Sequence, residues 1–167
     1  MSSDAARVEH EFPPVFDERS KVLVLGTIPS PKSRQLGFYY MHPQNRFWRM
    51  LCAALGEEVP ADIEGRRRLC LSRGVALWDV LAECDISGAA DSSIKNAVPN
   101  DLARVFSAAD IRAVFTTGKK AQALYERYFP QFPRAVCLPS TSPANRTISE
   151  SEMLERYREI AAALRDE

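Results

Sequence analysis

The amino-acid sequence predicts an α/β protein in which a central, mainly parallel four-stranded sheet lies between two helical layers. Two observations predict this three-layer α/β/α sandwich. Short apolar runs typical of buried strands alternate four times with segments whose apolar residues recur at helical spacing. The sequence also contains no internal repeat and no low-complexity run. One parallel sheet with right-handed crossovers therefore accounts for the alternation.

Length and composition are those of an ordinary globular protein, and they predict one domain spanning residues 1–167. The chain has 167 residues, of which 46% are hydrophobic and 26% charged. A chain of this size buries enough surface to fold without disulfides or metals. Residues 1–18 are polar and acidic, so we expect a loose lead-in there. Because the sequence shows no run of about 18 apolar residues and no signal-peptide pattern, we expect a cytoplasmic protein with no membrane partner.

The charged residues and cysteines argue against some classes of function. Lys and Arg total 22 and Asp and Glu total 22, so the net charge is zero rather than the basic balance of a strong nucleic-acid binder. A local basic patch can still supply phosphate contacts. The four cysteines form no CxxC pair, and the two histidines are not arranged around them. We therefore expect no metal site, no iron–sulfur cluster and no cofactor.

The first strand and the first helix are separated by a long loop. Val22–Leu25 is a continuous apolar run, as expected of a strand covered on both faces, and it ends at Gly26. Apolar residues then recur at helical spacing over residues 48–55, with Gly56 as the C-cap. The loop between them, residues 26–45, is about 20 residues long. Loops of that length are uncommon in compact domains unless they carry function, so we interpret this one as the active site.

The remaining elements continue the alternation of strands and helices. A surface helix is expected within residues 57–73, a second strand at 74–80 and a loop at 82–98. The next expected helix starts at residues 99–101. The later elements are a strand at 111–118, a helix at 119–128, a strand at 134–138, a loop at 139–147 and a last helix that begins with a capping box of Ser149 and Glu152.

The loops that follow the four strands are expected to meet. In a parallel sheet the carboxyl ends of the strands face the same edge, where ligands bind. The loops in question are residues 26–45, 79–96, 116–118 and 139–146. We therefore expect one pocket between them, although this argument from the fold does not identify its chemistry.

The most specific motif is the run Phe38–Trp48, with the sequence FYYMHPQNRFW. Aromatic rings beside amide side chains suit a flat heterocycle, because the rings stack on its face and the amides hydrogen-bond to its edge. Tyr39 or Tyr40, together with His42 and Asn45, are the candidates for such contacts. The last two aromatics of the run are interpreted as core residues. His42 alternatively braces the loop by bonding to a backbone carbonyl.

Three other segments are less specific. Residues 26–30, GTIPS, follow a strand but lack the GxGxxG and GxxxxGK[ST] patterns of dinucleotide and triphosphate sites. Their backbone N–H groups suit an anion or a base edge. Residues 138–146, LPSTSPANR, place hydroxyls and prolines at a strand end, which suits either phosphate binding or a helix-capping turn. Residues 91–96, DSSIKN, form either a third wall of the pocket or a solvated loop.

These segments together resemble the uracil-DNA glycosylase superfamily. Gly26–Trp48 is similar to its first motif region, closest to the branch of mismatch-specific thymine/uracil and hypoxanthine-DNA (deoxyinosine) glycosylases. Residues 138–145 resemble the second motif in its hypoxanthine-type form, and residues 91–101 are similar to the same subgroup. The resemblance implies a compact α/β/α fold. It also implies a monomeric, monofunctional DNA glycosylase that acts on DNA containing a deaminated base, without a cofactor.

The resemblance implies roles for individual residues. The catalytic groups would be Asn45 and the backbone of Thr27 and Ile28. Contacts with the base are expected from Gly26, Tyr39, Tyr40, His42 and Ser92. Contacts with DNA are expected from Ser30, Ser140, Thr141, Ser142, Pro143, Ala144, Asn145 and Arg146.

Departures from the superfamily pattern shift the expected substrate. Ile28 stands where mismatch-type members carry asparagine, residues 26–30 contain no carboxylate, and residues 138–140 lack the histidine of the uracil enzymes. We therefore expect hypoxanthine as the preferred base, with xanthine or uracil as alternatives, in a protein associated with the nucleoid through DNA. The rival hypotheses are a nucleotide- or nucleoside-binding α/β protein and a DNA module that recognises lesions without cleaving them.

Overall fold

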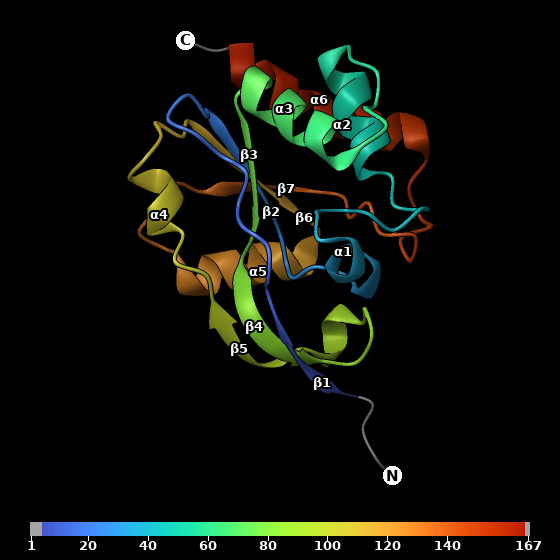
Figure 1. Ribbon diagram of the computed structural model, residues 1–167, viewed down its shortest axis with the longest axis vertical. Coiled ribbons are helices and arrows are strands. Elements are labelled where there is room, and N and C mark those ends of the chain that lie inside the picture. The colour runs from blue at the N-terminus through green and yellow to red at the C-terminus, as the bar shows by residue number, and fades with distance from the viewer. Residues whose placement is uncertain (1–4, 166–167) are drawn as a thin grey trace.

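The computed structural model describes residues 5–165, and at its centre lies a four-stranded parallel sheet. The strands run in the order β3–β2–β6–β7 (Figure 1). Their bounds are Val22–Gly26 for β2, Val75–Asp79 for β3, Ala113–Thr117 for β6 and Ala135–Leu138 for β7. Every residue of β2 and β3 is buried, which explains the apolar runs in the sequence of both strands.

Helices cover both faces of this sheet. α2 (Phe47–Leu55), α3 (Ile63–Arg73) and α6 (Glu150–Arg165) lie on one face, and α5 (Lys119–Tyr128) lies on the other (Figure 1). In the first layer α2 packs on α6, α6 contacts β2 and α3 contacts β3, whereas α5 contacts β6 and β7. Ser149 caps α6 as predicted, because its hydroxyl accepts from the Glu152 amide. The same hydroxyl, rather than the Ser149 backbone N–H of a full capping box, donates to the Glu152 carboxylate. The predicted α/β/α layering is confirmed.

The predicted loose lead-in is wrong for residues 6–9, which form a strand. β1 (Ala6–Glu9) pairs antiparallel with β4 (Leu81–Ile86). Only Val8 of β1 is buried, and Arg7 forms ion pairs with two carboxylates of β4. The backbone ladder with β4 pairs all four residues of β1, and the exposed cross-strand ion pairs add little to it. Because a single residue of β1 is buried, its sequence carries no clear strand signal. Residues 1–4 of the expected lead-in lie outside the described residues.

The predicted loop at residues 82–98 is wrong at both ends, where residues 82–86 and 95–98 belong to strands. β4 follows β3 directly and pairs antiparallel with β5 (Lys95–Pro99), so that β1, β4 and β5 form a second sheet (Figure 1). A 3-10 turn, η1 (Asp91–Ser93), lies between β4 and β5. Register shifts between these two strands interrupt the strict alternation that marks a strand in sequence. The interruption explains why the segment resembled a loop.

Two short helices complete the fold. The long loop after β2 contains α1 (Pro31–Leu36), which Ser30 caps by accepting from the Ser33 amide at 3.2 Å. Gly37 ends α1 in the left-handed conformation, with φ of 76°. The helix expected after β5 is a single turn, α4 (Ala103–Phe106). The loop after β2 is therefore partly ordered by its own local structure.

Two other kinds of feature are absent from the described part of the chain. No helix among residues 5–165 is long and apolar enough to cross a bilayer. Over the same residues, no group of three or more His, Cys, Asp or Glu side chains is placed to hold a metal ion.

Candidate active site

The loops that follow the four parallel strands surround one cavity of about 490 Å³. This volume lies in the range of small-molecule and cofactor sites. The lining comes from the loop after β2, from Asp79 at the end of β3, from residues 86–91 at and after the end of β4, from Thr117 at the end of β6, and from residues 140–144 after β7. Asn45 and Ser140 line the same cavity although they are far apart in sequence. The expected convergence of the strand-end loops is confirmed.

Gly26 forms the part of the cavity wall where β2 ends, and three polar groups approach it. A Cβ atom at this position would lie 2.5 Å from Asp79 Oδ1, 3.0 Å from the Tyr40 hydroxyl and 3.5 Å from Thr117 Oγ1. The 2.5 Å contact is too short for any side chain, so the close approach requires glycine. The carbonyls of Gly26 and the next residue accept hydrogen bonds from the amides of residues 80–81, at 2.8 and 3.1 Å. These bonds anchor the start of the loop to the link between β3 and β4.

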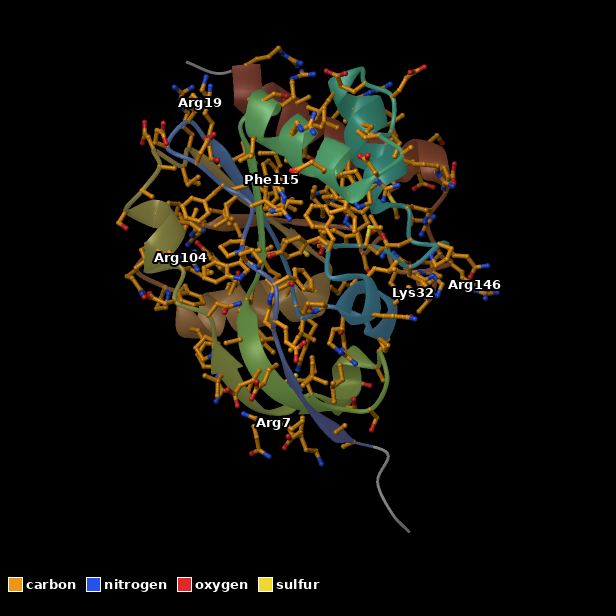
Figure 2. The ribbon with its side chains drawn as sticks, viewed as in Figure 1. Arg7, Arg19, Lys32, Arg104, Phe115 and Arg146 are labelled. Atoms are coloured by element: carbon orange, nitrogen blue, oxygen red, sulfur yellow. The ribbon has the colours of Figure 1, made fainter. Side chains whose placement is uncertain are left out.

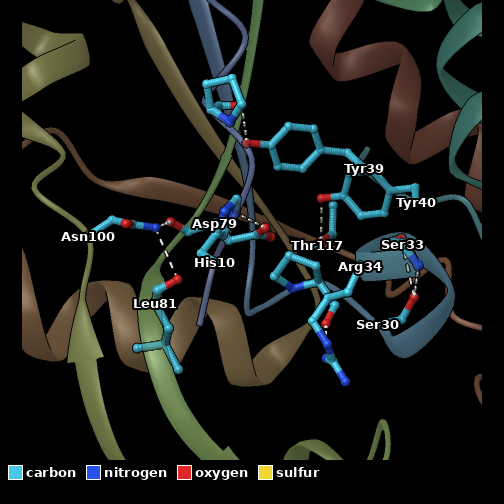
Figure 3. A network of polar contacts seen from close by, with 12 residues as sticks. His10, Ser30, Ser33, Arg34, Tyr39, Tyr40, Asp79, Leu81, Asn100 and Thr117 are labelled. Carbon is cyan, nitrogen blue, oxygen red and sulfur yellow. Dashed lines mark hydrogen bonds and ion pairs between the residues drawn. The ribbon is translucent and has the colours of Figure 1, made fainter. Parts of the chain in front are cut away.

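The two candidate tyrosines meet the cavity differently. Tyr40 stacks on Phe47 with ring centroids 3.9 Å apart, and its hydroxyl lies 3.1 Å from Thr117 Oγ1 (Figure 3). Its φ of 57° is left-handed, a conformation that is rare for bulky residues and tends to occur at functional sites. Tyr39 is only 2% exposed, and its hydroxyl donates to the carbonyl of Pro13 at 3.0 Å. Burial raises the pKa of Tyr40 well above its ordinary value, so its phenol stays neutral.

The last two aromatics of the motif belong to the core, as the sequence predicts. Phe47 and Trp48 are both buried at the start of α2. The indole N–H of Trp48 donates to the Tyr39 carbonyl at 2.9 Å, and its ring stacks on Phe38. These contacts fix the backbone that presents Tyr40 to the cavity.

Asn45 lies just before α2, where its side chain serves both the helix and the cavity. Its Oδ1 accepts from the Phe47 amide at 2.9 Å, and its backbone amide donates to the His42 carbonyl at 2.9 Å. His42 Nδ1 accepts from the Gln44 amide at 3.1 Å, so the proton of a neutral His42 ring is assigned to Nε2. The loop therefore offers two donors, the side-chain N–H₂ of Asn45 and the Nε2–H of His42.

The loop after β7 is a preformed turn. Ser140 Oγ accepts from the Ser142 amide, and Ser142 Oγ accepts from the Ala144 amide, both at 3.2 Å. The side chain of Asn145 donates to the Ser140 carbonyl at 2.9 Å. Thr141 lines the cavity but is only 1% exposed. Serine hydroxyls and backbone, rather than the threonine, are therefore the accessible polar groups of this loop.

Arg46 ties this loop to the start of α2. Its backbone amide donates to the Thr141 carbonyl at 3.1 Å. Its guanidinium donates to the carbonyl of Asn145 at 2.7 Å and to that of Ile148 at 3.4 Å. Arg46 thus holds two walls of the cavity at a fixed relative position. One wall comes from the long loop after β2, and the other comes from the loop after β7, residues 139–147, which we call the late loop.

Most residues predicted for the site lie at the cavity. Those that line it are Gly26, Thr27, Ile28, Ser30, Tyr39, Tyr40, His42, Asn45, Ser140, Thr141, Ser142, Pro143 and Ala144. Ser92, Asn145 and Arg146 lie outside the lining. Ser92 is exposed on η1, and its neighbour Asp91 contributes to the wall instead. Asn145 acts within its own loop, and Arg146 projects into solvent (Figure 2).

Sequence reasoning missed a buried pair of side chains, one of which, Asp79, lines the cavity. Asp79, at the end of β3, meets His10 through Oδ2 and Nε2 at 2.8 Å, and the two side chains are 5% and 2% exposed (Figure 3). An aspartate that ends an apolar strand was the available signal for Asp79. His10 lies in the segment expected to be loose, and no local pattern connects it with a residue 69 positions later.

Comparisons with known proteins identify the family. The model of the uracil DNA glycosylase superfamily matches residues 13–166. The chain belongs to this superfamily. The resemblance carried by the loop motifs is therefore confirmed.

Individual superfamily relatives agree with this assignment. A hypoxanthine DNA glycosylase from Methanosarcina acetivorans is 30% identical over 150 residues, which cover 89% of this chain and 95% of the relative. A hypoxanthine DNA glycosylase from Methanosarcina barkeri is 35% identical over 112 residues, covering 66% of this chain and 71% of the relative. A solution NMR structure from Methanosarcina acetivorans, provisionally named a uracil DNA glycosylase, superposes with a TM-score of 0.76 at 31% identity. That superposition covers 90% of this chain and 96% of the other.

The superfamily match also bears on the missed pair. It begins at residue 13, so Asp79 lies within it and His10 lies before it. The N-terminal segment thus adds a side chain to the cavity region from outside the matched residues.

Proposed function

We propose that this protein is a DNA glycosylase that releases hypoxanthine from deoxyinosine in DNA, with xanthine or uracil as further substrates. The observation that carries the proposal is the single cavity in which Asn45, Tyr40 and residues 140–144 meet. Two relatives that carry the name hypoxanthine DNA glycosylase support the choice of base.

The reaction requires the target nucleotide to leave the duplex. A base inside the stack is out of reach, so the enzyme flips it into a pocket and pays the cost of unstacking. The bond between the base nitrogen and sugar C1′ then breaks, and its electron pair leaves with the base. Water adds to C1′ and gives up a proton, and the departing base takes up a proton. The products are free hypoxanthine and an abasic site.

The protein's contribution is a set of positioned hydrogen-bond donors. In the transition state the sugar becomes positive and the base becomes negative, so donors aimed at the base lower the barrier. We assign this role to the side-chain N–H₂ of Asn45, because the Asn45 oxygen is already held by the Phe47 amide. The backbone N–H groups of Thr27 and Ile28 are the second set of donors, at the end of β2.

Base recognition is assigned to the wall beside Asn45. We expect Tyr40 rather than Tyr39 to contact the face of the base, because Tyr39 is nearly fully buried and its hydroxyl is bonded away from the cavity. His42 lines the same wall, and its Nε2–H suits a carbonyl of the base.

DNA binding is assigned to the rim of the cavity. The hydroxyls of Ser30, Ser140 and Ser142 and the exposed guanidinium of Arg146 suit phosphate oxygens. To Pro143 and Ala144, which are apolar and line the cavity, we assign the filling of the space that the flipped base leaves in the duplex. One chain supplies every residue of the cavity, so we infer that the protein acts as a monomer. We expect it to be found in the cytoplasm with the DNA of the nucleoid.

Incubation with synthetic duplexes tests this proposal. Each duplex carries one deoxyinosine, deoxyxanthosine or deoxyuridine, and hot alkali then cleaves the strand at abasic sites. We expect strand breaks at deoxyinosine at a higher single-turnover rate than at deoxyuridine. Retarded migration of the duplex without breaks would show a lesion-binding module instead. Neither breaks nor retardation would point to a nucleotide-binding protein and would refute the proposal.

A further inference from the structure

Thr117 is a polar residue of the cavity wall that has no role in the function proposed so far. It is the last residue of β6, which lies between β2 and β7 in the parallel sheet, and it lines the cavity. Its backbone is in register with Leu138 of β7, and the amide of Gly118 donates to the Leu138 carbonyl at 2.9 Å. Because the residue belongs to an inner strand of the sheet, its side chain projects from a rigid backbone.

The Thr117 side chain meets Tyr40, the residue assigned to the face of the base. Thr117 Oγ1 lies 3.1 Å from the Tyr40 hydroxyl (Figure 3). Among residues 5–165, that hydroxyl has no other hydrogen-bond partner. Phe47 stacks on the Tyr40 ring with centroids 3.9 Å apart. The ring is therefore fixed by a stacking contact from α2 and by a hydrogen bond from β6.

The backbone conformation of Tyr40 makes this hydrogen bond important. Its φ of 57° lies in the left-handed region, which is unfavourable for a bulky residue and persists only where the surrounding structure holds it. The two neighbours in sequence are anchored through their backbones, because the Tyr39 carbonyl accepts a hydrogen bond at 2.9 Å and the Met41 amide donates one at 3.0 Å. Neither bond acts on the Tyr40 ring, whose hydroxyl end is held by Thr117.

We propose that Thr117 is the positioning residue for Tyr40, and that its hydrogen bond keeps the ring in the orientation that receives the flipped base. This inference rests on the proposed function. A ring that is already ordered loses less conformational freedom when the base binds than a ring that must first be ordered. Thr117 therefore acts through Tyr40, and its contribution should appear as affinity for the base.

The test compares two duplexes that differ in whether a base is present to meet the ring. One carries 2′-fluoro-deoxyinosine, whose fluorine disfavours the positive sugar and blocks cleavage. The other carries tetrahydrofuran, a stable abasic analogue, in place of the nucleoside. Phosphate contacts are common to both, so the affinity for the first duplex relative to the second isolates the contribution of the base. Thr117→Val removes the hydroxyl and keeps the shape of the side chain, and we expect it to lower this relative affinity by about threefold to tenfold.

Three further variants test whether the hydrogen bond is the cause. Tyr40→Phe removes the other hydroxyl but keeps the ring, so it should lower the relative affinity as Thr117→Val does. Because both substitutions remove the same bond, the double variant should be no weaker than either single variant. Thr117→Ser keeps a hydroxyl and should retain the wild-type relative affinity.

Thr116→Val is the matched control. Thr116 precedes Thr117 on β6, is buried outside the cavity lining, and donates to Gln122 Oε1 at 2.6 Å. Loss of its hydroxyl should lower the melting temperature and leave the relative affinity unchanged. The inference is overturned if Thr117→Val and Tyr40→Phe, shown by thermal melting to be folded, both keep the wild-type relative affinity. It is also overturned if their effects add in the double variant, or if Thr117→Ser or Thr116→Val lowers the relative affinity as much as Thr117→Val does.

Failure of the inference can be told from failure of the proposed function. If the wild-type protein releases hypoxanthine from deoxyinosine while Thr117→Val and Tyr40→Phe keep the wild-type relative affinity, only the role of Thr117 is wrong. If the wild-type protein releases no base from any of the cleavable duplexes, the proposed function fails and this inference fails with it.

Discussion

At the scale of single residues, Asn45 has two roles, and substitution by alanine would remove both at once. Its oxygen caps the Phe47 amide, and its N–H₂ group is the proposed donor to the departing base. Asn45→Ala removes both, so we expect single-turnover release of hypoxanthine to fall by about 10² or more, with affinity for DNA largely retained. Loss of the cap should lower the free energy of unfolding by about 1 kcal/mol. Quench-flow kinetics and denaturant titration measure the two effects.

Asn45→Asp separates the two roles. The carboxylate keeps an oxygen for the Phe47 amide but has no N–H to donate. Stability should stay near that of wild type while release remains slow. Near wild-type release by Asn45→Ala would remove the residue from the mechanism. Fast release by Asn45→Asp would show that the oxygen, not the N–H₂ group, takes part.

Gly26 is the residue whose replacement should most directly disturb the cavity wall. A Cβ at Gly26 would lie 2.5 Å from Asp79 Oδ1, so Gly26→Ala must displace the carboxylate and should cost about 1–3 kcal/mol of unfolding free energy. If that contact is the cause, the cost should shrink in an Asp79→Ala background, with a coupling of about 0.5–3 kcal/mol. Urea titration of the two single variants and the double variant measures it. Additive effects would contradict this account.

The sequence identifies site residues only where they form a local pattern. Tyr40, His42 and Asn45 stand within a few positions of one another, so their shared place at the cavity could be predicted. Which of Tyr39 and Tyr40 faces the cavity could not be predicted from the sequence. It depends on the hydrogen bond between the Tyr39 hydroxyl and the carbonyl of Pro13, which is distant in sequence. The pair His10–Asp79 depends wholly on tertiary structure, since each residue alone resembles an ordinary polar position.

At the scale of elements, Arg46 should govern how the late loop is held. Arg46→Ala removes the guanidinium bonds to the carbonyls of Asn145 and Ile148 but keeps the backbone bond to Thr141. We expect faster amide hydrogen exchange over residues 140–148 and about tenfold weaker binding to inosine-containing DNA, because the loop loses a bond from a charged donor.

A neighbouring arginine provides the control for Arg46. Arg49 lies in the first turn of α2, which Arg46 precedes, and it pairs with Glu150 at the surface, outside the cavity. Arg49→Ala should leave exchange in the late loop and DNA affinity near their wild-type values. Equal effects of both substitutions would indicate a general weakening of α2, rather than the loss of the specific hydrogen bonds between Arg46 and the late loop.

Elements with strong periodicity were predictable, and those stabilised by distant partners were not. The apolar run of β2 and the helical spacing in α2 and α6 gave the central sheet and its layers. β1 has a single buried residue, and the pairing of β4 with β5 is irregular, so neither showed the alternation that marks a strand. The second sheet, which includes β1, therefore escaped prediction.

At the scale of the whole molecule, a net charge of zero means that attraction to DNA must come from a local group of cations. Arg146 is exposed on the loop that lines the cavity, whereas Arg19 lies in a different part of the molecule (Figure 2). We expect Arg146→Ala to lower the slope of log K against log salt by about 1, equally for damaged and undamaged DNA. Arg19→Ala should leave the slope unchanged. A slope that Arg146→Ala does not alter would exclude this contact.

The central claim is that the cavity at the ends of the four parallel strands takes a base flipped out of DNA. The most direct measurement is a crystal structure of the protein with a duplex that contains 2′-fluoro-deoxyinosine. The account predicts the hypoxanthine ring inside the cavity, with Tyr40 against its face and the side-chain N–H₂ of Asn45 within hydrogen-bond distance of the base. A complex in which the inosine remains stacked in the duplex, with DNA bound away from the cavity, would contradict it.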